Sequence, residues 1–157
     1  MPVTPFHFGL GAALHGAAPR HVSFLAFCAA NVLIDVESIW NLLQGHAHVH
    51  AFFHTCIGAT LAGLATAALC LRWRRWRLGQ PLPAVHRRSL VFGGLLGAWS
   101  HVMLDSVMHA DVRPLAPFSE ANGLYLWMPL PELHLLLAGL GVLGGTAVWL
   151  RRLHAED

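Results

Sequence analysis

Three polar residues recur at one-turn intervals in an otherwise apolar stretch, where His101, Asp105 and His109 stand at positions i, i+4 and i+8. On a helix, this spacing projects at least the first two side chains from one face. His50 and His54 repeat the i, i+4 relation in another apolar stretch. Neutral imidazoles combined with carboxylates are a ligand set for zinc and similar divalent ions. The spacing therefore predicts a metal site.

Other acidic and imidazole side chains could complete this site. Asn31, Asp35 and Ser38 form a polar stripe on one predicted helix, and Glu37 points to another face unless the helix ends there. Asp35 or Glu37 could act as a general base if it is not fully engaged as a ligand. His134 is a further candidate ligand in the last apolar stretch. The alternative is that these groups only pair with one another inside a core.

The composition indicates which class of protein positions these groups. Of the 157 residues, 55% are hydrophobic and 11% are charged, whereas soluble domains carry about 25% charged residues. The net charge is only +2. These values exclude a disordered chain, a nucleic-acid binder and a water-soluble enzyme with an ordinary surface, and the length allows one domain, residues 1–157.

Five apolar segments divide the chain, at 6–18, 21–43, 51–71, 89–109 and 132–150. Crossing the hydrocarbon core takes about 20 residues of helix. The last four segments are long enough to span the membrane. The first is short, and the sequence leaves open whether it spans the membrane. We therefore expect an all-α, integral membrane helical bundle with about four transmembrane helices and a short N-terminal helix.

Arginine predicts the orientation of this bundle. Nine of the ten basic residues fall at segment ends that an alternating path places on one side: Arg20, Arg72, Arg74, Arg75, Arg77, Arg87, Arg88, Arg151 and Arg152. The positive-inside bias then places the 72–88 loop and the C-terminus in the cytoplasm, in a bacterial inner membrane. Arg113 is the outward exception. It could bind a phosphate or carboxylate through its planar fork, or pair with Asp111 or Glu120 to order the loop.

The buried polar residues fall at similar depths. With a rise of 1.5 Å per residue, they lie roughly 20 to 27 Å from the arginines of the same segments. The residues of this layer are His7, Asp35, His54, His101, Asp105 and His134. Ionisable residues inside a membrane are costly and by default mark function, so we expect five segments to converge on one site in the outer half of the bilayer.

Four pieces of the chain, 4–9, 30–37, 50–55 and 101–105, resemble the YdjM-like family of membrane-bound metal-dependent hydrolases. That family is more remotely similar to the all-helical zinc-dependent phospholipase C and P1 nuclease group, which cleaves phosphoesters. The resemblance implies metal-ligand roles for His7, Asp35, His54, His101 and Asp105. The chain departs from the soluble enzymes at His134, which has Ala138 four residues later where they carry a glutamate.

The leading hypothesis is a metal-dependent hydrolase with one to three divalent ions, zinc first. Its substrate would be a small amphipathic or phosphate-containing molecule, and the lipid bilayer would be its other partner. A metal-ion transporter or metal sensor is the alternative, although the apolar residues between His101 and the arginine side offer no polar path. A haem-binding electron carrier would use histidines on facing helices, but it needs no carboxylate one turn from the histidine.

Overall fold

The computed structural model describes residues 4–156, which fold into helices joined by loops. Helix α1 comprises Thr4–Ala17, α2 Phe24–Leu43, α3 Cys56–Leu78, α4 Ala84–Met108 and α5 Leu130–Glu156. A single 3-10 turn, η1, covers Phe52–His54 just before α3. Residues 4–156 contain no strand, so the prediction of an all-α fold is confirmed.

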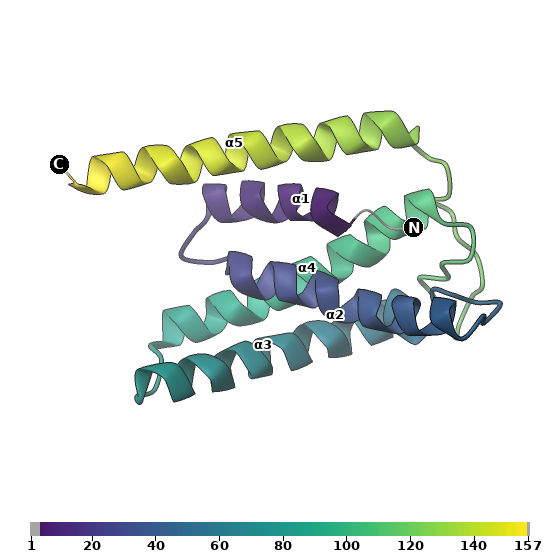
Figure 1. The fold of residues 1–157 in the computed structure, drawn as a ribbon, viewed down its shortest axis with the longest axis horizontal. Coiled ribbons are helices and arrows are strands. Elements are labelled where there is room, and N and C mark those ends of the chain that lie inside the picture. Colours follow the sequence, from purple (N-terminus) through teal and green to yellow (C-terminus); the bar gives the residue numbers. More distant parts are fainter. Residues whose placement is uncertain (1–3, 157) are drawn as a thin grey trace.

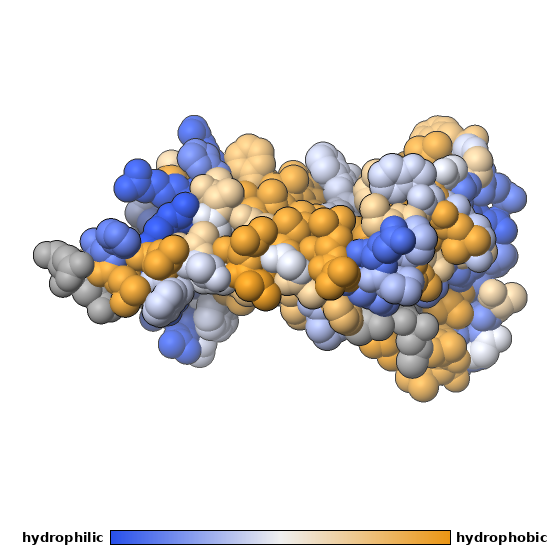
Figure 2. Space-filling view, turned by 90° about the horizontal axis from the view of Figure 1, so that it is seen from above, coloured by the Kyte–Doolittle hydropathy of each residue, from blue (hydrophilic) through white to orange (hydrophobic). Residues whose placement is uncertain are grey.

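Four of these helices, α2 to α5, are long and apolar enough to cross a membrane. The surface supports this, because a broad apolar band separates more polar groups at the two ends of the molecule (Figure 2). Helix α1 has 14 residues and is therefore about 21 Å long, less than the roughly 30 Å hydrocarbon core. The chain is a membrane-spanning bundle with a short N-terminal helix.

Helices α2, α3 and α4 pack around a core of small side chains, and α1 lies between them and α5 (Figure 1). The core residues shared by the three helices include Ala30, Ala59 and Ala98, all fully buried. Small residues let helix backbones approach closely where lipid gives no hydrophobic drive to associate. Alanine at these positions therefore lets α2, α3 and α4 come close to one another.

Glycine permits the closest of these approaches. A Cβ placed on Gly97 of α4 would lie 2.5 Å from the carbonyl oxygen of Phe27 on α2. On α5, Gly144 lies against the backbone of Ala12 on α1, whereas Gly145 has no atom within 4 Å of its Cβ position. Of these two adjacent glycines, Gly144 is therefore the one that the α1–α5 contact requires.

The third apolar segment begins later than expected. Residues 51–55 form the η1 turn and its flanks, and Thr55 caps α3 by accepting the backbone N–H of Gly58 on its hydroxyl, at 3.0 Å. The expectation that His50 and His54 share one helix is therefore wrong. They meet through a loop and a turn instead, with ring centroids 4.6 Å apart.

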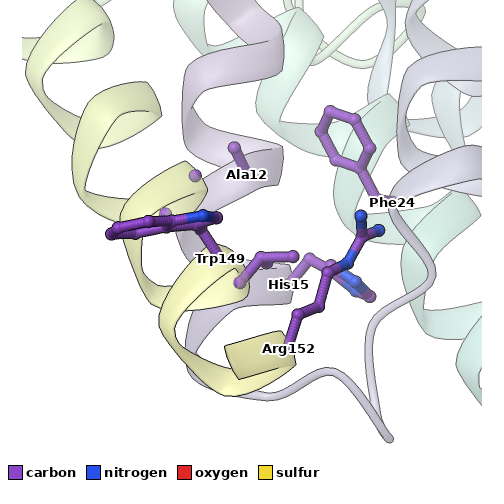
Figure 3. Close-up of a pocket in the computed structure, with 8 residues that line it drawn as sticks. Ala12, His15, Phe24, Trp149 and Arg152 are labelled. Carbon is purple, nitrogen blue, oxygen red and sulfur yellow. The ribbon is translucent and has the colours of Figure 1, made fainter. Parts of the chain in front are cut away.

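The two ends of the bundle differ in charge. The α1–α2 connection, the α3–α4 connection and the end of α5 lie together at one end, which carries nine of the ten arginines (Figure 1). A hollow of about 410 Å³ opens there between α1 and α5, with Arg152, Trp149 and His15 in its wall (Figure 3). The loops 44–55 and 109–129 lie at the opposite end (Figure 1).

Candidate metal centre

The carboxylate of Asp105 on α4 lies at the middle of a buried cluster of histidines at the loop end. His54 Nε2 is 3.3 Å from Asp105 Oδ2, and His101 Nε2 is 3.4 Å from the same oxygen. His7 Nε2 is 3.4 Å from Asp105 Oδ1. His7, His54, His101 and Asp105 are all 0% exposed, so three separate elements direct imidazoles at one shielded carboxylate.

A first donor group contains Asp35, His54, His101 and Asp105. One ligand atom from each of the four residues lies within 4.8 Å of the others, and Asp35 Oδ1 is 3.2 Å from His101 Nε2. Ligand bonds of about 2.0–2.1 Å place the donors of a tetrahedral zinc site about 3.3 Å apart. The three separations given above, 3.2–3.4 Å, are close to this spacing, and the four residues could hold a metal ion.

A second donor group shares Asp105 with the first. It adds His50 and His109, and its ligand atoms also lie within 4.8 Å of one another. His50 Nε2 is 4.0 Å from Asp105 Oδ2, and the His50 and His109 rings stack with centroids 4.4 Å apart. One carboxylate thus belongs to both groups, and each group could hold a metal ion.

Two oxygens orient the rings of the first group. Nδ1 of His101 is 3.0 Å from Oδ1 of Asn31, and Nδ1 of His54 is 3.5 Å from Oγ of Ser38. The amide oxygen of Asn31 can only accept, so Nδ1 of His101 carries the proton and Nε2 is the nitrogen available to an ion. Metal-binding histidines commonly make this kind of contact through the nitrogen that is not bound to the metal. Both rings present Nε2 to Asp105.

The carboxylate of Asp111 orients the ring of His50 through a contact with its Nδ1. Its carboxylate oxygens lie 2.9 and 3.0 Å from His50 Nδ1, and Oδ2 also accepts the backbone N–H of His50 at 3.2 Å. Burial raises the pKa of Asp111, but these hydrogen bonds outweigh burial and hold that pKa below its ordinary value. A charged carboxylate thus turns Nε2 of His50 toward Asp105.

His109 completes the second group from the loop that follows α4. Partial burial is the largest influence on its ring and lowers the pKa of His109, with the nearby His50 acting in the same direction. A lowered pKa keeps the imidazole neutral near pH 7, the form that binds metals. His109 can therefore offer a lone pair without first losing a proton.

Four imidazole nitrogens in the cluster give a direct test of whether these residues fit a metal. The Nε2 atoms of His7, His50, His101 and His109 are buried and form no hydrogen bond to any residue within 4–156. Buried polar atoms are nearly always satisfied, so each exception needs an explanation such as an ion. Ions held by the two donor groups would satisfy the Nε2 atoms of His50, His101 and His109, so these residues fit a metal.

His7 is placed differently from the other ligand candidates. Its Nδ1 is 3.2 Å from Nδ1 of His101, and the two rings meet edge to face with centroids 4.7 Å apart. It belongs to neither of the two donor groups, although its Nε2 faces Asp105. The structure thus brings His7 to the centre, on the side of Asp105 that faces α1.

Glu37, Arg113 and His134 lie outside the two donor groups. The Glu37 carboxylate accepts the backbone N–H groups of Phe52 and Phe53, at 3.1 and 2.6 Å, and so anchors the η1 turn. Arg113 pairs with Glu120 at 2.7 Å. The ring of His134 packs on Phe6, with centroids 4.5 Å apart.

Asp111 is a contributor that the sequence analysis considered only as one possible partner for Arg113. A local signal was available, because Asp111 follows the candidate ligand His109 by two residues. Its contact with His50 crosses 61 positions of the chain and depends on how two loops meet, so spacing alone could not reveal it.

Comparison with known proteins adds no relative to this description. No family model matches the chain, and neither the curated proteins nor the solved structures contain a match to it. The assignment of function therefore depends on the geometry of the site.

Proposed function

We propose that the chain is a membrane-embedded hydrolase that cleaves a phosphoester with two zinc-type ions joined by Asp105. The observation that carries this proposal is the meeting of two donor groups at that single buried carboxylate. Paired metal sites recur in enzymes that transfer or hydrolyse phosphoryl groups, where the two ions clamp the attacking and leaving oxygens.

The donor set favours zinc over magnesium or calcium. Four imidazoles, those of His50, His54, His101 and His109, belong to the two groups. Magnesium and calcium prefer oxygen ligands, whereas zinc accepts imidazole and carboxylate together. When bound, such an ion makes water nucleophilic at neutral pH and polarises the phosphoryl oxygen.

The chain supplies a carboxylate for the accompanying proton transfer. Water forms a new bond to phosphorus while the bond from phosphorus to the ester oxygen breaks. The proton lost by the water would pass to the Asp35 oxygen that is not engaged as a ligand and from there to the departing oxygen, so the products are an alcohol and a phosphate. Asp35 suits this task because it lines the groove that leads to the centre, whereas Glu37 is engaged by backbone N–H groups.

The same proposal includes the orientation of the protein. Arginine-rich ends remain on the cytoplasmic side of a bacterial inner membrane under the positive-inside rule. The nine arginines at one end of the bundle then direct the loops and the candidate centre toward the outer face. The substrate would be met at that face.

Hydrolysis by the purified protein tests the proposal. In detergent, the zinc-loaded wild type should release nitrophenol from bis(p-nitrophenyl) phosphate, lose this activity after exhaustive chelation and regain it with added zinc. Asp105→Asn should be inactive and hold little metal. Glu132→Gln, which makes the same change at an exposed carboxylate of α5, should match the wild type. Activity that survives chelation would refute the proposal.

A further inference from the structure

A groove of about 500 Å³ leads from the surface between α1 and α2 to the candidate centre. Its outer wall is apolar and includes Phe8 of α1 with Val32, Val36 and Ile39 of α2. Its inner end is polar and contains Asp35, Ser38, His50 and His109. The groove therefore connects an apolar mouth to both donor groups.

The mouth of this groove opens toward lipid. Val32, Val36 and Ile39 are 52%, 54% and 56% exposed, and they lie within α2, a helix that can span the membrane. The lining extends along α2 from Val32 to Leu42, a rise of about 15 Å. A molecule entering here would come sideways from the hydrocarbon region.

A second hollow, of about 400 Å³, lies on the loop side of the centre and contains Arg113 and His48. His50 and Asp111 line both hollows. The His50–Asp111 pair therefore borders both spaces, with the apolar walls of one on one side and the Arg113 guanidinium of the other on the other side. A phosphodiester with one apolar and one polar substituent has this distribution of chemistry.

We propose that the substrate is a glycerophospholipid of the bilayer, which reaches the centre through the groove between α1 and α2. One acyl chain lies along α2, the phosphate lies beside His50 and His109, and the head group extends toward Arg113. Because lipid tails are as apolar as leucine, moving an acyl chain from the bilayer into the groove gains no hydrophobic free energy from the apolar walls. They set access and orientation. The chemical step rests on the proposed hydrolase function, whereas occupation of the groove can be tested separately.

Photo-crosslinking tests the occupant directly. The whole protein is placed in phosphatidylcholine vesicles that contain a small share of phosphatidylcholine with a diazirine in one acyl chain. Labelling should include Ser38, which is 3% exposed and is reached from the groove. Val36→Trp should fill the groove and reduce this labelling several-fold. Val142→Trp, the same change at a 69% exposed valine of α5, should leave it unchanged.

Absence of label at Ser38 in the wild type would overturn the proposal, as would equal labelling of Val36→Trp and the wild type. Val32→Trp repeats the block one turn away, in case Val36→Trp fails to fold. Retained metal content verifies that each variant keeps its centre. Each result therefore decides whether lipid occupies the groove.

Kinetics separate this inference from the hydrolase function. The ratio of kcat/KM for vesicle phospholipid to kcat/KM for bis(p-nitrophenyl) phosphate should fall in Val36→Trp and stay unchanged in Val142→Trp. If lipid labels Ser38 but neither ester is cleaved, the inference that phospholipid occupies the groove is supported and the hydrolase function is refuted. If the soluble ester is cleaved while lipid leaves Ser38 unlabelled, the hydrolase function is supported and the inference that phospholipid occupies the groove is refuted.

Discussion

The amide of Asn31 on α2 fixes the ring of His101 on α4. Its Nδ2 donates to the carbonyl oxygens of Phe27 and Gly97, at 2.9 and 3.2 Å, so Oδ1 must face His101. Nδ1 of His101 is then a protonated nitrogen, and Nε2, which faces Asp35 and Asp105, is the nitrogen that an ion could bind. A neutral amide thus determines which nitrogen of a buried imidazole faces the carboxylates.

Asn31→Leu should weaken zinc binding by about 10- to 100-fold, the usual effect of losing a hydrogen-bond partner of a metal ligand. Competition with a chromogenic chelator measures the dissociation constant. Asn41→Leu is the matched control, because Asn41 also donates to a carbonyl oxygen, that of Val49, and belongs to neither donor group. Equal affinities in the two variants would show that Asn31 has no effect on the centre.

Asp111→Ala should remove the ion held by His50, Asp105 and His109 and spare the ion held by the first group. The reason is that only His50 loses the acceptor of its Nδ1 proton. Elemental analysis of purified protein measures the metal content per chain. Asp111→Asn keeps an acceptor oxygen and should retain more of the metal. Full occupancy in Asp111→Ala would contradict the role given to this carboxylate.

Glu37→Gln should lower stability while leaving turnover nearly unchanged. Hydrogen bonds to charged groups contribute about 1.5–3 kcal/mol each, and Glu37 receives two from the η1 turn. Thermal unfolding in detergent measures the loss. Asp35→Asn should instead abolish hydrolysis. If Glu37→Gln were as inactive as Asp35→Asn at temperatures where it stays folded, Glu37 would be the general base.

Gly97→Ala should destabilise the protein by about 1–3 kcal/mol, the range for overpacking a close contact. The added methyl group would meet the carbonyl oxygen of Phe27 at 2.5 Å and push α4 away from α2. Gly145→Ala meets nothing within 4 Å and should instead be neutral or stabilising, because alanine is the better helix former. Denaturation of both variants in the same detergent gives the comparison.

Arg113→Gln and Glu120→Gln distinguish two roles for Arg113. Their ion pair is exposed and contributes at most about 1 kcal/mol, so neither change should affect folding much. If Arg113 binds phosphate, Arg113→Gln raises KM and Glu120→Gln, which releases the guanidinium, does not. If the pair only orders the loop, both variants change KM alike.

The sequence predicts the elements and the depth of the site better than the directions of its side chains. Hydrophobic length locates the four long helices, and the i, i+4 spacing places His101 and Asp105 on one face of α4. His134 lies at a similar predicted depth, but its ring faces Phe6. Distance along a helix gives height, whereas rotation about the axis is set by packing.

The spacing of residues in the sequence could not predict how the loops are arranged. His50 reaches Asp105 from a loop that Asp111 holds by three hydrogen bonds. No helical period describes such a contact, because it depends on two loops meeting in space. The same holds for the η1 turn, which Glu37 anchors from a neighbouring helix.

Helix α5 joins the rest of the molecule mainly through α1, the short helix that carries His7. His7 therefore stands at the seam between a two-helix unit and a three-helix unit. Until these units dock, Asp105 lacks one of its imidazole neighbours and one side of its shield. The shielded centre is therefore complete only when the two units are packed together.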